Sequence, residues 1–318
     1  MSESRTVKIG VIGLGAFARV ARLPILAGMP KVEMTACMAR TPETVDQVSR
    51  QFGFARKYTD LEALIGDSGI EAAIVATPKP THHDIVIPLL ERGIHVFCEK
   101  PMAMSIPQAE QMVACAEANG RVLMIGFNRR YAPVYDWAKQ EFADRPPDVC
   151  VAFKNRPGSE YRATMENAIH MADLLRFFCG ECTEITAHAK FTDPDYEDSA
   201  AAILKFESGS VGFLLGNRTC GQWMERVELY GGGKTVVVHC PDEITVVDQK
   251  QEHTRKMTPL HFGWATLEEK MGFRQEMEAF VAAVTTGSVP RSAAADSIKT
   301  HILMNRLLKA AGLPEMEA

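Results

Sequence analysis

The sequence predicts two domains: an α/β Rossmann domain with a doubly wound parallel sheet over residues 1–126, and an α+β domain with a large, mostly antiparallel open sheet over residues 127–318. Three observations predict this fold. Short apolar strands alternate with helices up to residue 126, a glycine turn follows the first strand, and after Tyr131 the strands follow one another directly. A length of 318 residues also favours more than one hydrophobic core.

The first domain is predicted from the alternation of strand and helix. The expected strands are Val7–Ile12, Val32–Ala39, Ala72–Thr77, His95–Cys98 and Val122–Gly126, and the expected helices are Ala16–Ala27, Pro42–Phe52, His82–Glu91 and Pro107–Asn119. Pro42 and Pro107 suit the first turn of a helix, and Gly93 and Gly120 suit the position just past its end. Such sheets bind ligands beyond the carboxyl ends of their strands.

The second domain begins with a helix and then becomes rich in strands. The expected helices are Pro133–Phe142, Ala163–Phe178, Leu267–Thr285 and Ala294–Ala311, and the expected strands are Val149–Asn155, Glu184–Phe191, Ala200–Glu207, Val211–Asn217, Arg226–Tyr230, Thr235–Cys240 and Glu243–Asp248. Ser208-Gly209-Ser210 and the glycine run that starts at Gly231 are typical of hairpins. A large open sheet needs its second face covered, so we expect a homodimer or homotetramer formed through this sheet.

The glycine turn is the strongest functional motif of the chain. Gly13-Leu14-Gly15-Ala16-Phe17-Ala18 reads G-x-G-x-x-A and follows the first strand directly. Gly13 allows a tight turn, Gly15 lets backbone N–H groups approach a pyrophosphate, and Ala18 lets the helix pack closely on the strand. The motif predicts a dinucleotide site that includes Ala16 and Phe17, although an ordinary strand-to-helix turn can carry similar glycines.

The end of the second strand favours NADP over NAD. An NAD-binding protein places Asp or Glu there, to accept hydrogen bonds from the ribose 2′-hydroxyl. This chain has Ala39-Arg40-Thr41 instead, which removes the acidic charge and offers a guanidinium and a hydroxyl to a 2′-phosphate. Such a charge-assisted contact contributes about 1.5–3 kcal/mol. NAD remains the alternative, with Arg40 stacking on adenine without discriminating.

The ends of the third and fourth strands supply the candidate reacting centre. The third strand leads into Thr77-Pro78 and, further on, His82, and the fourth strand leads into Glu99-Lys100-Pro101. We expect Thr77, Pro78 and His82 to lie near the cofactor, His82 in a supporting role. Because Lys100 follows a short apolar strand closely, its aliphatic stem should be partly buried rather than fully exposed.

These motifs together make the chain resemble the Gfo/Idh/MocA family, which includes glucose–fructose oxidoreductase and inositol dehydrogenase. The resemblance covers essentially the whole chain. Its markers are the glycine turn, Thr77-Pro78 with His82, Glu99-Lys100-Pro101, Gly126–Tyr131, His170 with Asp173, and Glu197–Ala200. It implies an NAD(P)-dependent oxidoreductase acting on sugars, cyclitols or related alcohols and carbonyls. It also implies that Glu99 and Lys100 lie beside the nicotinamide ribose and that Lys100 reaches the substrate.

A second catalytic element is expected on the helix over residues 163–178. Glu166, His170 and Asp173 are spaced i, i+4 and i+7, so they share one face of an α-helix. By the resemblance, His170 matches the catalytic histidine, and Glu166 stands where the family usually has Asp. The longer side chain could shift a carboxylate by about an ångström, which can lower a rate on the order of 10²-fold. A buried structural histidine is the alternative reading of His170.

The expected mechanism assigns His170 as the acid or base and Lys100 as the group that holds and polarises the substrate oxygen, with both side chains meeting over the nicotinamide. The expected substrate-binding residues are Asn128, Arg130, Asn155, Tyr161 and Asp173. Surface solvation explains several of these polar residues equally well. Two alternatives are a nucleotide-binding sensor that has lost turnover, motivated by Glu166, and a reductase of unsaturated or aromatic-derived carbonyl compounds.

Composition and charge disfavour several other classes of protein. A net charge of −5 gives no electrostatic reason to expect nucleic acid or an anionic membrane as a partner. No apolar run approaches the roughly 18 residues of a membrane span, and no signal peptide is evident, so we expect a cytoplasmic protein. The eight cysteines are interpreted as free thiols, even at Cys179-Gly180-Glu181-Cys182, and no metal site is expected.

Overall fold

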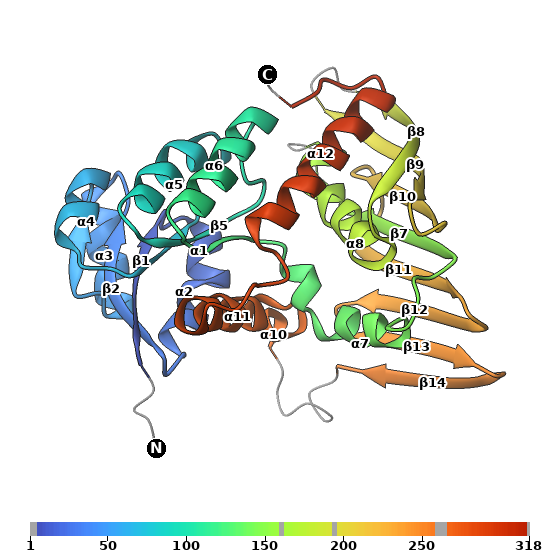
Figure 1. Ribbon diagram of the computed structural model, residues 1–318, viewed down its shortest axis with the longest axis horizontal. Helices are drawn as coiled ribbons and strands as arrows, with labels where there is room; N and C mark the ends of the chain where they lie inside the picture. Colours follow the sequence, from blue (N-terminus) through green and yellow to red (C-terminus); the bar gives the residue numbers. More distant parts are fainter. Residues whose placement is uncertain (1–4, 159–161, 193–195, 258–265, 317–318) are drawn as a thin grey trace. The chain divides into compact units, whose positions relative to one another are not determined.

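The computed structural model describes residues 5–158, 162–192, 196–257 and 266–316 (Figure 1). The chain forms two compact units. The first contains the described residues up to Gly126 together with Phe273–Ile298, and the second contains the described residues from Phe127 to Gly272 together with Lys299–Met316. The boundary after Gly126 coincides with the expected one. A second domain running without interruption over 127–318 needs correction, because Phe273–Ile298 packs with the first unit.

The first unit is built on a six-stranded parallel sheet in the order β3-β2-β1-β4-β5-β6, which confirms the predicted Rossmann fold. Its strands are β1 (Val7–Ile12), β2 (Val32–Met38), β3 (Arg56–Tyr58), β4 (Ala72–Val75), β5 (His95–Cys98) and β6 (Leu123–Ile125). The strand order reverses between β1 and β4. Ligands of such sheets bind at this point, beyond the carboxyl ends of the strands.

Helices connect these strands and follow the expected pattern with a few differences. They are α1 (Ala16–Ala21), α2 (Leu23–Ala27), α3 (Pro42–Phe52), α4 (Leu61–Asp67), the 3₁₀ turn η1 (Lys79–Thr81), α5 (His82–Glu91), α6 (Ile106–Ala118) and α11 (Phe273–Thr286). The helix expected over Ala16–Ala27 is divided at Arg22. Strand β3 and helix α4 were not predicted, because β3 is short and its charged residues are exposed, so it carries no apolar alternation.

The second unit contains an eight-stranded sheet in the order β14-β13-β12-β11-β7-β10-β9-β8. Its strands are β7 (Val149–Asn155), β8 (Cys182–Phe191), β9 (Glu197–Phe206), β10 (Val211–Asn217), β11 (Met224–Gly231), β12 (Lys234–Cys240), β13 (Glu243–Asp248) and β14 (Gln251–Lys256). β7 and β10 pair in parallel, and the other neighbouring strands pair antiparallel, as predicted. β14 was not predicted, because all its residues are polar and exposed.

Helices cover one face of this sheet, as Figure 1 shows for α7 and α8. The helical segments are the 3₁₀ turn η2 (Asn128–Tyr131), α7 (Pro133–Glu141), the π-helical segment η3 (Ala163–Ala168), α8 (Ile169–Cys179), α10 (Leu267–Lys270) and α12 (Ala294–Ala310), whose first turn belongs to the first unit. Along β7, Cys150, Ala152 and Lys154 are buried and the alternate residues are half-buried. The sheet therefore has a covered face and an open face.

Among the described residues, no helix combines the length and the apolar character that crossing a bilayer requires.

Candidate functional site

The glycine turn lies between β1 and α1, at the carboxyl end of the parallel sheet. Gly13 has a φ of +94°, and a Cβ added there would come within 2.6 Å of the Ala76 backbone. Glycine is therefore required by both conformation and space. A Cβ added at Gly15 would meet nothing within 4 Å, so the space beside this residue is open. Ala18 is buried against the core. An open cradle bordered by backbone N–H groups fits a pyrophosphate.

The residues after β2 are available to a ligand. Arg40 is exposed, and within the described parts of the chain it forms no hydrogen bond or ion pair. Thr41 is the N-cap residue that precedes α3, but its hydroxyl makes no capping hydrogen bond. Ala39 brings no acidic group to this position. The residues after β2 therefore offer a guanidinium and a hydroxyl to an anionic group of a ligand.

The loop after β4 is held by His82. This side chain is buried, with Nδ1 2.8 Å from the carbonyl oxygen of Pro101 and Nε2 3.0 Å from that of Thr77. The Thr77 hydroxyl in turn accepts a hydrogen bond from the Thr81 hydroxyl at 2.9 Å. Both ring nitrogens of His82 face backbone oxygens, so the side chain ties the loop that carries Thr77 and Pro78 to Pro101, the residue after Lys100. The supporting role of His82 at the cofactor stays a prediction.

Glu99 and Lys100 directly follow β5 and differ in their surroundings. Lys100 is half-buried, as its position after an apolar strand predicts, and the peptide bond to Pro101 is cis. The Glu99 carboxylate is mostly buried, and its Oε1 accepts a hydrogen bond from Nε of Arg22 at 2.7 Å. Arg22 also donates to Glu276 on α11. Sequence reasoning missed Arg22 and Glu276, because their partners lie far away along the chain.

Glu166 lies in a segment that is not an α-helix. Residues Ala163–Ala168 form a π-helix, so the common face expected for an uninterrupted α-helix needs correction here. The Glu166 carboxylate accepts a hydrogen bond from the Arg162 backbone N–H at 3.0 Å. Glu197 on β9 fixes the start of the same segment, because its carboxylate accepts from the Thr164 N–H at 3.0 Å and from the Arg162 guanidinium at 3.1 Å.

His170 is the second residue of α8, which starts directly after the π-helical segment. Its side chain is buried, and its ring packs edge to face on Phe127, with 6.3 Å between the ring centroids. Phe127 is also in contact with the ring of His301 at 6.0 Å. His170 belongs to the second unit, and Lys100 belongs to the first.

Three of the expected substrate-binding residues have structural partners instead. Asn128 is buried, donates to the Met271 carbonyl at 2.8 Å, and accepts from Arg129 at 3.1 Å. Arg130 and Asp173 form a buried ion pair, with Nη2 2.6 Å from Oδ1. Asp173 also accepts from Thr300 at 2.8 Å. These contacts hold the polar groups of Asn128, Arg130 and Asp173 inside the second unit, and their contact with substrate stays a prediction.

Asn155 and Tyr161 complete the expected substrate-binding set. Asn155 lies on the open face of the sheet, where it lines a cavity of about 680 Å³ with Phe153 and His188. This is the face opposite to the one that α8 covers, and the contact of Asn155 with substrate stays a prediction. The register places the neighbouring Lys154 on the covered face instead. Tyr161 lies outside the described residues.

A buried charge cluster occupies the covered face of this sheet. Glu225 on β11 accepts two hydrogen bonds from Arg129 at 2.9 Å and pairs with Lys154 at 2.5 Å. Burial and the nearby Arg129 lower the pKa of Lys154 to about 8, although Glu225 acts in the opposite direction. Burial alone would raise the pKa of Glu225, but Arg129 and Lys154 outweigh it and hold that pKa far below its usual value.

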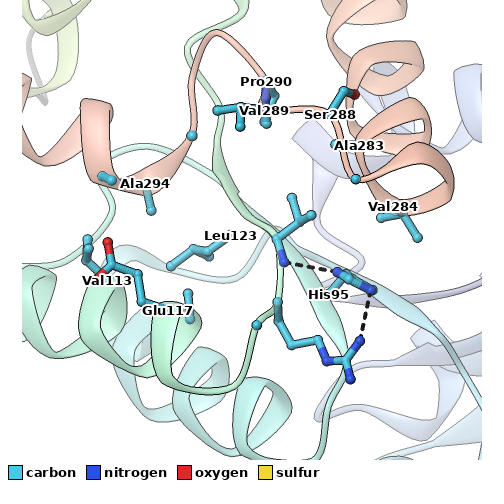
Figure 2. A pocket seen from close by; sticks show the side chains of 17 residues that line it. His95, Val113, Glu117, Leu123, Ala283, Val284, Ser288, Val289, Pro290 and Ala294 are labelled. Carbon is cyan, nitrogen blue, oxygen red and sulfur yellow. Dashed lines mark hydrogen bonds between the residues drawn. The ribbon is translucent and has the colours of Figure 1, made fainter.

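A cavity of about 330 Å³ opens at the other end of the parallel sheet (Figure 2). His95 at the start of β5 and Leu123 at the start of β6 line it, together with Val113 of α6 and Val284 of α11. Burial and the neighbouring Arg121 lower the pKa of His95. The cavity lies at the amino ends of the strands, away from the glycine turn, so it is separate from the candidate cofactor site.

The cysteines and the possible metal ligands were the last groups for which the sequence raised a functional question. All eight cysteines are free, with Cys179 at the end of α8 and Cys182 at the start of β8. In the described part of the chain, no group of three or more His, Cys, Asp or Glu side chains could hold a metal ion.

Family models match both units. Residues 7–127 match an oxidoreductase family with an NAD-binding Rossmann fold, and residues 135–237 match the GFO/IDH/MocA C-terminal domain. The matched ranges cover the glycine turn, the end of β5, and α8.

Individual relatives extend this similarity over most of the chain. Myo-inositol 2-dehydrogenase of Thermotoga maritima is 23% identical and covers 89% of this chain and 90% of its own. Inositol 2-dehydrogenase of Acidothermus cellulolyticus is 27% identical and covers 93% and 90%. A crystal structure of an oxidoreductase from Agrobacterium radiobacter, in complex with NAD+, L-tartaric acid and magnesium, is 22% identical, covers 96% of both chains and superimposes with a TM-score of 0.87. This last similarity establishes the fold.

Proposed function

Because the chain belongs to the Gfo/Idh/MocA family of oxidoreductases, we propose that it transfers a hydride between NADP and a sugar, a cyclitol or a related small alcohol or carbonyl compound. The observation that carries the proposal is the open cradle at Gly15, combined with the exposed Arg40 shortly after β2, which has no bonding partner among the described residues. Relatives named as inositol dehydrogenases support the class of substrate.

The preference for NADP is the finer part of this proposal. Arg40 and Thr41 offer a cation and a hydroxyl where a 2′-phosphate would lie, and Ala39 carries no charge to repel it. A scyllo-inositol dehydrogenase of Bacillus subtilis, 26% identical over 67% of this chain, is named as NAD(+)-dependent. NAD is therefore the alternative that the coenzyme experiment must decide.

The proposed chemistry divides between Lys100 and His170. A bound nicotinamide coenzyme supplies the hydride acceptor or donor. Protonated Lys100 donates a hydrogen bond to the substrate oxygen and polarises it, and His170 takes up or delivers the hydroxyl proton. Glu99 accepts hydrogen bonds beside the coenzyme ribose. An imidazole is a suitable general acid or base near neutral pH, which supports this role for His170.

A nucleotide-binding sensor without turnover is the second candidate function. Glu166 stands where the family usually has Asp, and its carboxylate accepts a hydrogen bond from the backbone of its own segment. A carboxylate held in this way is less free to support His170. Reduction of an unsaturated or aromatic-derived carbonyl compound would use the same residues and would differ in the substrate.

We also propose that the protein is a cytoplasmic homodimer or homotetramer that associates through the open face of the eight-stranded sheet. Ile203 on β9 and Leu215 on β10 are 49% and 37% exposed on this face. Exposed apolar side chains gathered on one face are typical of an interface. Light scattering of the wild type and of Ile203→Lys tests this, because a protein that is monomeric at all concentrations contradicts it.

Coenzyme binding provides the decisive test of specificity. We expect wild-type protein to bind NADPH more tightly than NADH, and Arg40→Ala to weaken NADPH binding by about ten- to a hundredfold while NADH binding changes little. Ala39→Asp should reverse the preference, because it restores the acidic acceptor and repels a 2′-phosphate. The measurement is the fluorescence of the reduced coenzymes on titration with protein. Equal or tighter NADH binding by the wild type would refute the NADP preference.

A measurement of substrate turnover distinguishes the proposed oxidoreductase from a nucleotide-binding sensor. Inositols, aldoses and keto-sugars are supplied with the preferred coenzyme, and the absorbance of its reduced form is followed. Oxidation or reduction of any of them supports the enzyme. Tight coenzyme binding without turnover of any compound supports the sensor.

A further inference from the structure

Arg22 is the most deeply buried cation of the described first unit, with no part of its side chain exposed. It lies where α1 ends and α2 begins. Its guanidinium carbon lies 4.6 Å from the ring centroid of Phe97, 5.0 Å from that of Phe273 and 5.8 Å from that of Phe17. Aromatic faces attract a guanidinium at such distances, and they also exclude the water that would otherwise solvate it.

Two carboxylates share this guanidinium. Nε donates to Oε1 of Glu99 at 2.7 Å, Nη2 lies 2.6 Å from the same oxygen, and Nη1 donates to Oε2 of Glu276 at 2.8 Å. Burial alone would lower the pKa of Arg22, but Glu99 and Glu276 outweigh it and raise that pKa, so the guanidinium stays charged. Removing one partner of a buried ion pair is strongly destabilising, which makes these contacts hard to exchange.

The Arg22 cluster, meaning Arg22, Glu99 and Glu276, joins three segments that are distant in sequence. Arg22 follows the helix of the glycine turn, Glu99 directly precedes Lys100, and Glu276 lies on α11, which returns to the first unit from the end of the chain. A Cβ added at Gly126 would lie 2.8 Å from Oε2 of Glu99. One oxygen of Glu99 is therefore held by Arg22 while the other lies beside the Gly126 backbone.

We propose that Arg22 and Glu276 are positioning residues for the Glu99–Lys100 strand end, through which helix α11 controls coenzyme binding by the first unit. This inference rests on the proposed function, since it assumes that Glu99 lies at the coenzyme. Arg22 fixes the orientation of Glu99, and Glu276 fixes the orientation of Arg22. Arg22 and Glu276 are 254 residues apart in sequence, so no local motif could predict that they form an ion pair.

A double-mutant cycle on coenzyme affinity tests the proposal. Glu276→Gln keeps the shape of the side chain and removes its charge, and we expect it to weaken binding of the preferred reduced coenzyme by about fivefold or more. In a Glu99→Gln background the same substitution should change the affinity less than twofold, because its effect passes through Glu99. Ser49→Ala is the control. It removes a buried hydrogen bond to the Phe54 carbonyl in the same unit, and it should lower stability without changing coenzyme affinity.

Equal effects of Glu276→Gln in the two backgrounds, or no effect in either, would overturn the proposal. Amide hydrogen exchange of the coenzyme-free protein gives a second and independent measurement. Peptides that cover residues 95–104 should exchange faster in Glu276→Gln than in Ser49→Ala, and identical exchange would also overturn it. A wild-type protein that binds neither NADPH nor NADH would contradict the proposed function itself, and the exchange measurement would still decide whether Glu276 positions the strand end.

Discussion

The first unit buries one guanidinium between two carboxylates, whereas the second unit buries one carboxylate between two cations. In the Arg22 cluster, Glu99 and Glu276 share Arg22. In the second cluster, which we call the Glu225 cluster, Arg129 and Lys154 share Glu225 and the Tyr135 hydroxyl donates to it at 3.0 Å. The chemical groups are similar, but the clusters occupy different places in their sheets.

The position of each buried ion cluster relative to its strands determines whether a change in it affects the coenzyme site or only stability. Glu99 directly follows β5 and precedes Lys100, so a change in the Arg22 cluster reaches the proposed coenzyme site directly. Glu225 lies on the covered face of its sheet, paired across from Lys154 on β7. Its partner Arg129 lies on the turn after Phe127, so the Glu225 cluster holds that turn against the sheet. We therefore expect the Glu225 cluster to control stability.

Removal of the shared carboxylate should give the largest effect on stability. Glu225→Gln leaves Arg129 and Lys154 buried without their anionic partner, and we expect it to lower the free energy of unfolding by about 3–5 kcal/mol. Urea unfolding provides the measurement. Glu184→Gln, in an exposed pair with Lys205, is the matched control and should cost less than about 1 kcal/mol. A Glu225→Gln variant as stable as this control would contradict the expectation that the Glu225 cluster controls stability.

The pH dependence of stability should identify Lys154 specifically. Its pKa falls from 10.5 to about 8 on folding, because of burial and Arg129. Between these values the unfolded chain holds a proton that the folded protein has lost, so this group makes stability rise with pH by at most about 1.4 kcal/mol per pH unit. Relative to Lys154→Met, wild-type protein should therefore gain stability from pH 8 to pH 10. Parallel stability curves for the two proteins would show that Lys154 does not titrate in this window.

The Tyr135 hydroxyl should give the smallest effect. Tyr135→Phe removes one hydrogen bond to a carboxylate that keeps both cationic partners, so we expect a loss of about 1–2 kcal/mol in the free energy of unfolding. Coenzyme affinity should stay within twofold of the wild type. A loss as large as that of Glu225→Gln would indicate that Tyr135 contributes more than a hydrogen bond.

Local motifs made most of the first unit predictable from sequence. The glycine turn, the proline that begins α3, and the apolar strands each report a requirement of the backbone within a few residues, so their positions agree closely with the structure. Strand β14 and helix α4 were missed, because the first has only exposed polar residues and the second is short. β14 carries no apolar alternation, whereas α4 has the helical spacing of Leu61, Leu64 and Ile65 over only seven residues.

The partners of the buried side chains were not predictable in the same way. The bonds from Arg22 to Glu276 and from Arg130 to Asp173 join residues that only the folded chain brings together. Asn128 and Asn155 are both polar residues near expected strand ends. Sequence alone could not show that the Asn128 side chain forms hydrogen bonds with Met271 and Arg129, whereas Asn155 lies on the open face of the sheet. The π-helical segment at Glu166 likewise depends on Glu197, from a strand later in the chain.

The central claim is that Lys100 and His170 act on one substrate in the same chemical step. A double-mutant cycle on kcat tests it most directly. We expect Lys100→Met and His170→Ala each to lower kcat by on the order of 10²–10⁴-fold with little change in coenzyme affinity, and the double variant to be about as slow as the slower single variant. Losses that multiply in the double variant, or full activity of Lys100→Met, would contradict the claim.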